Sequence, residues 1–309
     1  MNNFGKVARG FKAFARALSG PRPEVPSITT PTKMPAIGVA LGGGFARGLA
    51  HVGVLKVLEE EGIPVSFIAG TSVGSVIGAA YCSGISAKEL EEIAGLVRFK
   101  HFARWTISRF GIASNDRMTG FLKKIVRART FEELRIPLAV STTDFVTGDA
   151  VVFRSGDLID PVRASCAYPG MFLPVNINGR LLIDGLLAHA VPTVPLREMG
   201  ADKVLAVYLS AHWVNLNGPR HVFDVIGQCF SIAQQKMCGL WESAADVIVT
   251  PDVRGFSYDG FERASDLIAA GEAVTRAALP KIKAWIAQPE AHVAGAKVVR
   301  PALNPVTSG

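Results

Sequence analysis

One serine lies in a pattern that can make its hydroxyl a nucleophile. Residues 70–74 have the sequence Gly-Thr-Ser-Val-Gly, with Ser72 at the centre. Residues 64–69 before it are typical of a short buried strand, and residues 73–81 after it are small and apolar, as in a packed helix. Glycines permit a tight turn at such a junction, which exposes the serine oxygen, and the N–H groups of the next helix point toward it. The pattern therefore predicts a nucleophilic Ser72 on a strand-to-helix turn.

A glycine-rich turn precedes this serine by one predicted strand and helix. Residues 36–41 predict a buried strand. The chain then runs through Gly42, Gly43 and Gly44 into a helical stretch. The N–H groups of a turn without side chains converge on one point and bind an anion. That anion is either the pyrophosphate of a dinucleotide or the oxyanion of an acyl-transfer intermediate.

Two observations favour the oxyanion. The glycines of the turn do not follow the spacing Gly-x-Gly-x-x-Gly, and the next strand, residues 65–69, lacks the terminal acidic residue that would bind a ribose. Neighbouring parallel strands also place the turns that follow them at the same edge of a sheet. We therefore expect the glycine-rich turn and Ser72 to lie together.

One aspartate ends a strand farther along the chain. Residues 181–183 are typical of a short strand, and Asp184 and Gly185 follow it. An aspartate at this position can face the sheet edge where the catalytic groups of open α/β folds gather. Asp-Gly is also a frequent turn without any catalytic role. Asp184 is thus a candidate base, and an ordinary turn remains the alternative.

Strands and helices alternate along the chain, which predicts an α/β layered sheet. The predicted strands are residues 36–41, 65–69, 138–142, 150–153, 181–183, 204–209 and 246–250, of which the third and fourth should form a hairpin. Long helices are predicted over residues 222–240 and 264–279. Residues 86–129 show a mixed helical pattern with a basic, aromatic segment at residues 98–110, for which we expect a solvated helix pair, with a lid or lipid-facing surface as the alternative.

Composition narrows the class of protein. The chain has 309 residues, of which 49% are apolar and 19% charged, as in a globular protein with one large α/β domain or two small ones. No apolar run reaches the roughly 18 residues of a membrane span. The four cysteines show no ligand spacing, so we expect buried thiols, a reducing compartment and a cytoplasmic protein.

The basic charge belongs to the N-terminal arm. Six lysines and arginines against Glu24 alone precede Met34, so most of the net charge of +7 lies there. Apolar residues recur at spacings of three and four over residues 4–18, which predicts an amphipathic basic helix. Such a helix can lie on an anionic membrane surface, which would make the protein peripheral on the inner face of the membrane. A helix docked on the protein's own surface, or a frayed tail, is the alternative.

These patterns divide the chain into three parts. Residues 1–35 contain the basic helix, with the membrane contact expected through residues 1–20, and a proline-rich linker. Residues 36–288 form the α/β domain, and residues 289–309 form a C-terminal tail without a clear pattern.

Four motifs occur in the order of a known family. With the glycine-rich segment 42–48, the serine turn 70–74, Ala164–Ser165 to Pro169 and the Asp184–Gly185 pair, the chain resembles the patatin-like phospholipase family, closest to the bacterial branch related to neuropathy target esterase. The resemblance runs from about residue 36 to about residue 282. It implies a three-layer α/β fold with a mostly parallel central sheet flanked by helices.

The resemblance also implies roles for individual residues. Ser72 would be the nucleophile and Asp184 its base, and the loop of Gly42, Gly43 and Gly44 would form the oxyanion hole. Arg47 matches the family's basic position in that loop, where the side chain either steadies the loop or attracts an anionic head group. In one departure, Leu186 follows Gly185 where the family usually has a second small residue.

The expected function is serine-dependent hydrolysis of carboxylic esters of membrane lipids, a phospholipid or a lysophospholipid. No metal, organic cofactor or nucleic-acid partner is expected. A Ser-His-Asp triad is the competing hypothesis, because four histidines follow the serine: His189, His212, His221 and His292. His51 lies inside the first predicted helix, where a structural role is more common. The sequence also leaves open a nucleotide-binding protein and a catalytically silent membrane-associated protein.

Overall fold

The computed structural model describes residues 34–98, 101, 104–108, 111–209 and 222–287. All of these residues belong to one compact structural unit. The helix predicted for residues 4–18 and the C-terminal tail lie outside the described residues. Among the described residues, no helix combines the length and the hydrophobicity needed to cross a membrane.

A central sheet of eight strands organises the described part of the chain. Its main path has the order β11, β10, β1, β2, β5, β9, β8, and β6 pairs with β5 beside this path. The bounds are β1 Ile37–Leu41, β2 Val65–Thr71, β5 Leu138–Asp144, β6 Ala150–Phe153, β8 Val175–Ile177, β9 Arg180–Asp184, β10 Lys203–Val207 and β11 Val247–Val249. The strands from β11 to β5 are parallel, whereas β6, β8 and β9 run antiparallel to their neighbours. All seven predicted strands are present, and the hairpin of β5 and β6 is confirmed.

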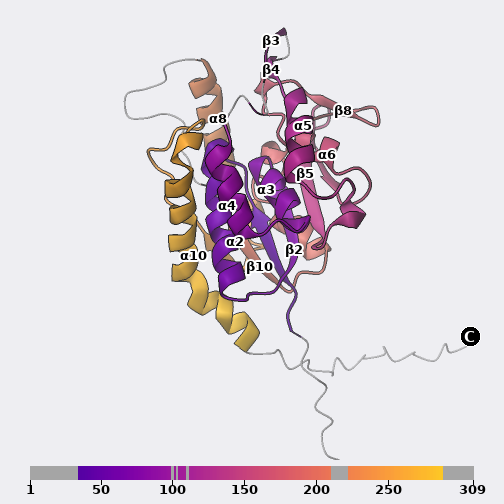
Figure 1. The fold of residues 1–309 in the computed structure, drawn as a ribbon. Helices are drawn as coiled ribbons and strands as arrows, with labels where there is room; N and C mark the ends of the chain where they lie inside the picture. The colour runs from indigo at the N-terminus through magenta and orange to yellow at the C-terminus, as the bar shows by residue number, and fades with distance from the viewer. Residues whose placement is uncertain (1–33, 99–100, 102–103, 109–110, 210–221, 288–309) are drawn as a thin grey trace, which may run out of the picture. The chain divides into compact units, whose positions relative to one another are not determined.

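Helices cover both faces of this sheet, so the fold is a three-layer α/β arrangement. One layer contains α2 (Ala50–Glu60), α3 (Val73–Cys82), α4 (Ala87–Leu96) and α10 (Ala264–Ala287). The opposite layer contains α7 (Thr193–Glu198) and α9 (Gly239–Glu242). Figure 1 shows α2, α4 and α10 side by side on one face of the sheet. The prediction of a central sheet flanked by helices is confirmed.

The alternation of side chains in β1 explains why two helical layers are needed. Ile37, Val39 and Leu41 pack into the core beneath α2, α3 and α10. Ala40 points the other way and packs with Leu196 of α7 and Trp241 of α9. Successive side chains of a strand face opposite sides of the sheet, and here both sides are apolar. Each face of the sheet therefore needs its own layer of helices to bury its apolar side chains.

The helical pattern predicted for residues 86–129 is confirmed at its two ends, in α4 and in α5 (Asp116–Ile125), but residues 104–108 and 111–114 between these helices are not helical. Helix α4 ends at Leu96, and the strands β3 (Arg104–Ser108) and β4 (Gly111–Ser114) follow it. Together with β7 (Gly170–Phe172) they form a separate three-stranded sheet. β4 pairs in parallel with β7, more than fifty residues later in the chain. A periodicity search within a short window cannot detect a partner so distant, and strand preference depends strongly on such partners.

Candidate active site

The glycine-rich turn and the serine turn lie at the same edge of the sheet. β1 and β2 are adjacent and parallel, and Leu41, the last residue of β1, is in register with Gly70. The chain leaves β1 through Gly42 to Gly44 and leaves β2 through Ser72, so the two turns are neighbours. The sequence-based expectation about their position is confirmed.

The turn at Ser72 combines a strained serine with two glycines in close contact. Ser72 has φ 54° and ψ −127°, a conformation that non-glycine residues rarely adopt. A Cβ atom on Gly70 would lie 2.5 Å from Ser75 Cα, and one on Gly74 would lie 2.1 Å from the carbonyl oxygen of Leu41. The glycines therefore allow the strand and the helix to approach each other, while the strain itself is in Ser72.

A buried serine holds this strained turn in place. The N–H of Ser72 donates to Ser165 Oγ at 2.8 Å, and the Ser165 hydroxyl donates to the carbonyl oxygen of Ser141 at 2.7 Å. Ser165 is the last residue of α6 (Ile159–Ser165) and is fully buried, and Ser141 lies in β5. This bridge ties the turn to the centre of the sheet. The motif that contains Ser165 was visible in the sequence, but its partner atoms were not.

Asp184 reaches the same edge from a strand that runs in the opposite direction. Thr71 pairs with Ser141 across β2 and β5, and Asp184 pairs with Thr142 across β5 and β9. Asp184 thus lies at nearly the same level of the sheet as Ser72, although β9 is antiparallel. Asp184 lies at the sheet edge where we expected it. Because β9 is antiparallel to β5, this position depends on the register of the two strands, and not on the common edge that adjacent parallel strands share.

The Asp184 carboxyl group is fully buried and only partly satisfied. Its Oδ1 accepts a hydrogen bond from the N–H of Leu186 at 3.0 Å. Burial raises the pKa of Asp184 from 3.8 to about 7, while interactions with the Ser72 hydroxyl and the Leu186 N–H act in the lowering direction. In the described part of the chain, however, no group meets hydrogen-bond geometry at Oδ2. The Ser72 hydroxyl is therefore near the carboxyl group without forming a well-aligned hydrogen bond, a looser arrangement that is common in unliganded sites.

A polar cavity brings most of the predicted site residues together. Its lining includes Ser72, Asp184, Gly43, Gly44 and Arg47. Gly42 was also predicted for this site, but it does not line the cavity. The cavity thus unites the proposed nucleophile, its base and most of the glycine-rich loop.

The three glycines of the loop differ in their hydrogen bonds. The N–H of Gly42 donates to the carbonyl oxygen of Val207 at 3.2 Å, and that of Gly43 donates to Ala190 at 3.3 Å. The N–H of Gly44 has no acceptor among the described residues. The same holds for the N–H of Val73, the first residue of α3. Val73 was not among the predicted site residues, although the residue after a nucleophilic serine often supplies such an N–H.

His51 supports the loop from behind. Its Nε2 lies 2.8 Å from the carbonyl oxygen of Gly42, and the ring is fully buried in α2. Burial lowers the pKa of His51 to about 4, so the ring is neutral at pH 7 and Nε2 carries the proton that it donates to Gly42. The structural role expected for this histidine is thus a contact with the glycine-rich loop itself.

His189 does not line the polar cavity. Its Nδ1 lies 3.5 Å from Ser141 Oγ, its carbonyl oxygen accepts a hydrogen bond from the Thr71 hydroxyl at 2.7 Å, and its side chain lines a different cavity. The other three histidines considered for a triad lie outside the described residues. The described part of the chain therefore places an aspartate, and no histidine, in the cavity with Ser72.

Arg47 is a buried cation at the polar cavity. Its side chain is only 6% exposed, and its Nε donates to the carbonyl oxygen of Phe256 at 2.9 Å. It forms no ion pair with an acidic side chain of the described residues. Burial lowers the pKa of Arg47 to about 10, which leaves the guanidinium charged at neutral pH. The group can attract an anion that enters this cavity.

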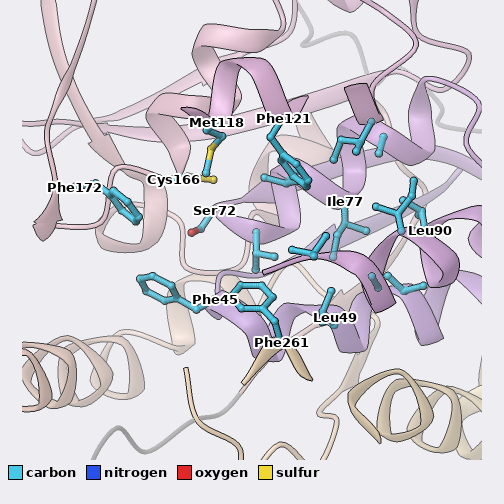
Figure 2. Close-up of a pocket in the computed structure, with 18 residues that line it drawn as sticks. Phe45, Leu49, Ser72, Ile77, Leu90, Met118, Phe121, Cys166, Phe172 and Phe261 are labelled. Atoms are coloured by element: carbon cyan, nitrogen blue, oxygen red, sulfur yellow. The ribbon is translucent and has the colours of Figure 1, made fainter. Parts of the chain in front are cut away.

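A second cavity, lined by apolar side chains, also begins at Ser72. Figure 2 shows Ser72 at its edge, with the aromatic rings of Phe45, Phe172 and Phe261 around the cavity. Ser72 and Phe45 line both cavities. The serine thus lies where a polar space meets an apolar one, as the cleavage of an ester between a hydrocarbon chain and a polar group would require.

The model of the family described as patatin-like phospholipase matches residues 39–197, about half of the chain, including Ser72 and Asp184. This chain belongs to the patatin-like phospholipase family. The match covers both turns at the sheet edge and the strand that ends in Asp184. The family expected from the four sequence motifs is confirmed.

Individual members of the patatin-like phospholipase family are moderately similar to the chain. An uncharacterized NTE family protein of Mycobacterium tuberculosis is 34% identical over 191 residues, which cover 57% of this chain and 49% of that protein. The lysophospholipase NTE1 of Cryptococcus neoformans is 32% identical over 233 residues, covering 72% of this chain and 14% of that protein. The chain therefore spans about half the length of the mycobacterial relative and a small part of the fungal one.

Among solved structures, the crystal structure of VipD from Legionella pneumophila aligns with a TM-score of 0.47 and 14% sequence identity, covering 81% of this chain and 67% of that one.

Proposed function

We propose that this chain hydrolyses carboxylic ester bonds of membrane lipids, with Ser72 as the nucleophile and Asp184 as its base. The observation that carries the proposal is the cavity in which Ser72, the Asp184 carboxyl group and Gly44 lie together, where one carboxyl oxygen and the Gly44 N–H have no partner among the described residues. The relatives named lysophospholipases support a phospholipid or lysophospholipid as the substrate class.

The first half of the proposed reaction forms an acyl-enzyme. Ser72 Oγ attacks the ester carbonyl carbon while Asp184 accepts the hydroxyl proton. The carbonyl oxygen becomes an oxyanion, which can accept hydrogen bonds from the N–H groups of Gly44 and Val73, two groups without an acceptor within the described residues. Each such donor typically lowers the barrier by about 2.7–4 kcal/mol. In this proposal Gly42 and Gly43 shape the loop, because their own N–H groups already have carbonyl acceptors.

The second half releases the products. The tetrahedral intermediate collapses, the ester C–O bond breaks, and Asp184 returns its proton to the departing alcohol. Water then attacks the acyl-enzyme with Asp184 again as base, which frees the fatty acid and restores Ser72. A pKa of about 7 suits a group that must both accept and return a proton near neutral pH.

A fluorophosphonate probe tests the nucleophile directly. The folded protein should be labelled at Ser72, Ser72→Ala should not be labelled, and Asp184→Asn should be labelled far more slowly. Absence of labelling in a folded protein would contradict the proposal. Binding of NAD or ATP in its place would favour the nucleotide-binding hypothesis, and the absence of both would favour a silent protein.

We also propose that residues 1–20 bring the enzyme to an anionic membrane surface, with residues 1–35, 36–288 and 289–309 as arm, catalytic domain and tail. The support is the basic, amphipathic sequence of the arm. Deleting residues 1–33 should weaken binding to vesicles with anionic lipid, and salt should weaken the binding of the full chain. Hydrolysis of a soluble ester should persist in the deletion variant. Equal vesicle binding by both proteins would contradict this proposal.

A further inference from the structure

The apolar cavity follows one face of α3, starting at the serine. Val73, Val76, Ile77 and Ala80 line it, at spacings that place them on one side of a helix. Ser72 immediately precedes this helix and lines the same cavity. A helix rises about 1.5 Å per residue, so the eight steps from Ser72 to Ala80 span about 12 Å. The cavity is therefore a channel with the nucleophile at one end.

Three other helices contribute to the lining of the channel, with Val52 from α2. α5 (Asp116–Ile125) contributes Met118, Phe121 and Ile125, and α4 contributes Leu90 and Ala94. Figure 2 shows Leu90 at the end of the cavity opposite Phe172 and Cys166, which lie near Ser72. Ala80 and Leu90 thus belong to the far end, where α3 and α4 meet.

The lining accepts only one kind of ligand. Ser72 and Cys166 are the two members of the described lining whose side chains carry a hydroxyl or a thiol, and none carries a charge. Burial raises the pKa of the Cys166 thiol, so it stays neutral. A polar or charged group would lose its hydration here without a partner. A hydrocarbon chain would gain roughly 0.8 kcal/mol for each buried methylene.

We infer that this channel binds the acyl chain of the substrate and that Ala80 and Leu90 set the longest chain it accepts; the inference rests on the proposed ester hydrolysis at Ser72. With carbon–carbon bonds of about 1.5 Å, an extended chain advances about 1.25 Å per carbon, so a channel of about 12 Å holds about ten carbons. Longer chains must leave their terminal carbons outside the channel or displace the far wall.

Esters of graded length test the channel. For 4-nitrophenyl esters with two to sixteen acyl carbons, kcat/KM should rise about three- to fourfold per carbon up to about ten carbons and then stop rising. Ala80→Leu places three more carbon atoms at the far end and should lower the ratio of decanoate to butanoate hydrolysis at least tenfold. Leu90→Ala removes three and should move the optimum to longer chains. Because the two variants should shift the chain-length profile in opposite directions, a general loss of stability cannot explain both results.

A neighbouring alanine provides the matched control. Ala79 is also fully buried in α3 but does not line the channel. Ala79→Leu adds the same volume to another face and should leave the chain-length profile unchanged, even if it lowers the melting temperature. If Ala80→Leu does not fold, Leu90→Ala decides the question alone.

The outcomes separate the channel from the reaction. Hydrolysis of short esters with a profile that neither variant shifts would overturn the acyl channel and leave the proposed function intact. A wild-type optimum at sixteen carbons would overturn the length limit. Failure to hydrolyse any ester, short ones included, would overturn the proposed function and the channel's role with it.

Discussion

The two cavities that meet at Ser72 are built on opposite principles. The polar cavity holds groups that are costly to bury: the Arg47 guanidinium and the Asp184 carboxyl group, which among the described residues have no carboxylate partner and one unsatisfied oxygen, respectively. Apart from the Ser72 hydroxyl and a neutral thiol, the apolar cavity is lined by hydrocarbon side chains. Burying unpaired polar groups lowers the stability of a fold, whereas burying apolar surface raises it. Substitutions should therefore trade activity against stability in the first cavity, and change substrate preference in the second.

The largest effect should come from Asp184→Asn. The amide cannot accept the Ser72 proton, so kcat/KM should fall at least a thousandfold. The same change should stabilise the fold. Because the folded pKa of Asp184 is about 7 and its ordinary value is 3.8, the wild type loses stability as pH rises from about 4 to 7. The asparagine of the variant does not ionise, so the variant does not lose this stability. The free energy of unfolding of the variant should exceed that of the wild type by about 1–4 kcal/mol above pH 7, and the difference should be absent below pH 4.

Chemical denaturation at several pH values measures this advantage, and Ser72→Ala is the control. Ser72→Ala should abolish activity as well, but it keeps the carboxyl group and therefore most of the pH dependence of stability. If Asp184→Asn is less stable than the wild type at pH 8, the buried ionised carboxylate does not lower the free energy of unfolding.

The pH dependence of the wild-type reaction comes next. Asp184 must be ionised to act as a base, so kcat/KM for a short ester should fall about tenfold per pH unit below pH 7 and level off above it. Rate measurements from about pH 3 to pH 9 would locate the midpoint. A midpoint near pH 4 would mean that burial does not raise this pKa, and a midpoint lost in His189→Ala would favour the triad hypothesis.

A smaller effect is expected from Ser165→Ala, which removes the bridge that holds the serine turn. It removes the acceptor of the buried Ser72 N–H and one donor to the Ser141 carbonyl oxygen, which should cost about 1–3 kcal/mol of stability. Because the strained turn is then less well held, kcat should fall about 10- to 100-fold, with little change in KM.

Ser83 offers a matched control for this variant. Its hydroxyl also bridges two backbone groups, donating to Ala80 and accepting from the N–H of Arg127, but it does not line the polar cavity. Ser83→Ala should lower stability by a similar amount and leave kcat unchanged. An equal loss of kcat in both variants would assign the effect of Ser165 to stability alone.

The smallest expected effect concerns Arg47. Arg47→Gln removes the charge at the polar cavity, so KM for an anionic lysophospholipid should rise about tenfold more than KM for a neutral ester. Steady-state kinetics with both substrates measures the difference. An equal loss of kcat for both substrates would instead indicate that Arg47 steadies the loop through its hydrogen bond to Phe256.

Local patterns in the sequence determined the turns of this protein and the positions of its main strands along the chain. Each turn depends on a few consecutive residues: a strand, small residues and a helix over residues 64–81, or a strand and three glycines over residues 36–44. Adjacent parallel strands then bring the turns after β1 and β2 together, so the neighbourhood of Ser72 and the glycine-rich loop followed from sequence alone.

The tertiary structure alone decided which atoms are available for chemistry. The register of β9 against β5 sets the level of Asp184, and its burial sets its pKa near 7. Carbonyl groups from distant segments accept hydrogen bonds from the N–H groups of Gly42 and Gly43, whereas that of Gly44 has no acceptor in the part of the chain that the structure describes. The apolar channel exists because α2, α3, α4 and α5 pack around a common space. Hydrogen-bond partners, desolvation and cavities arise between residues far apart in the chain, and a local sequence pattern carries no information about such distances.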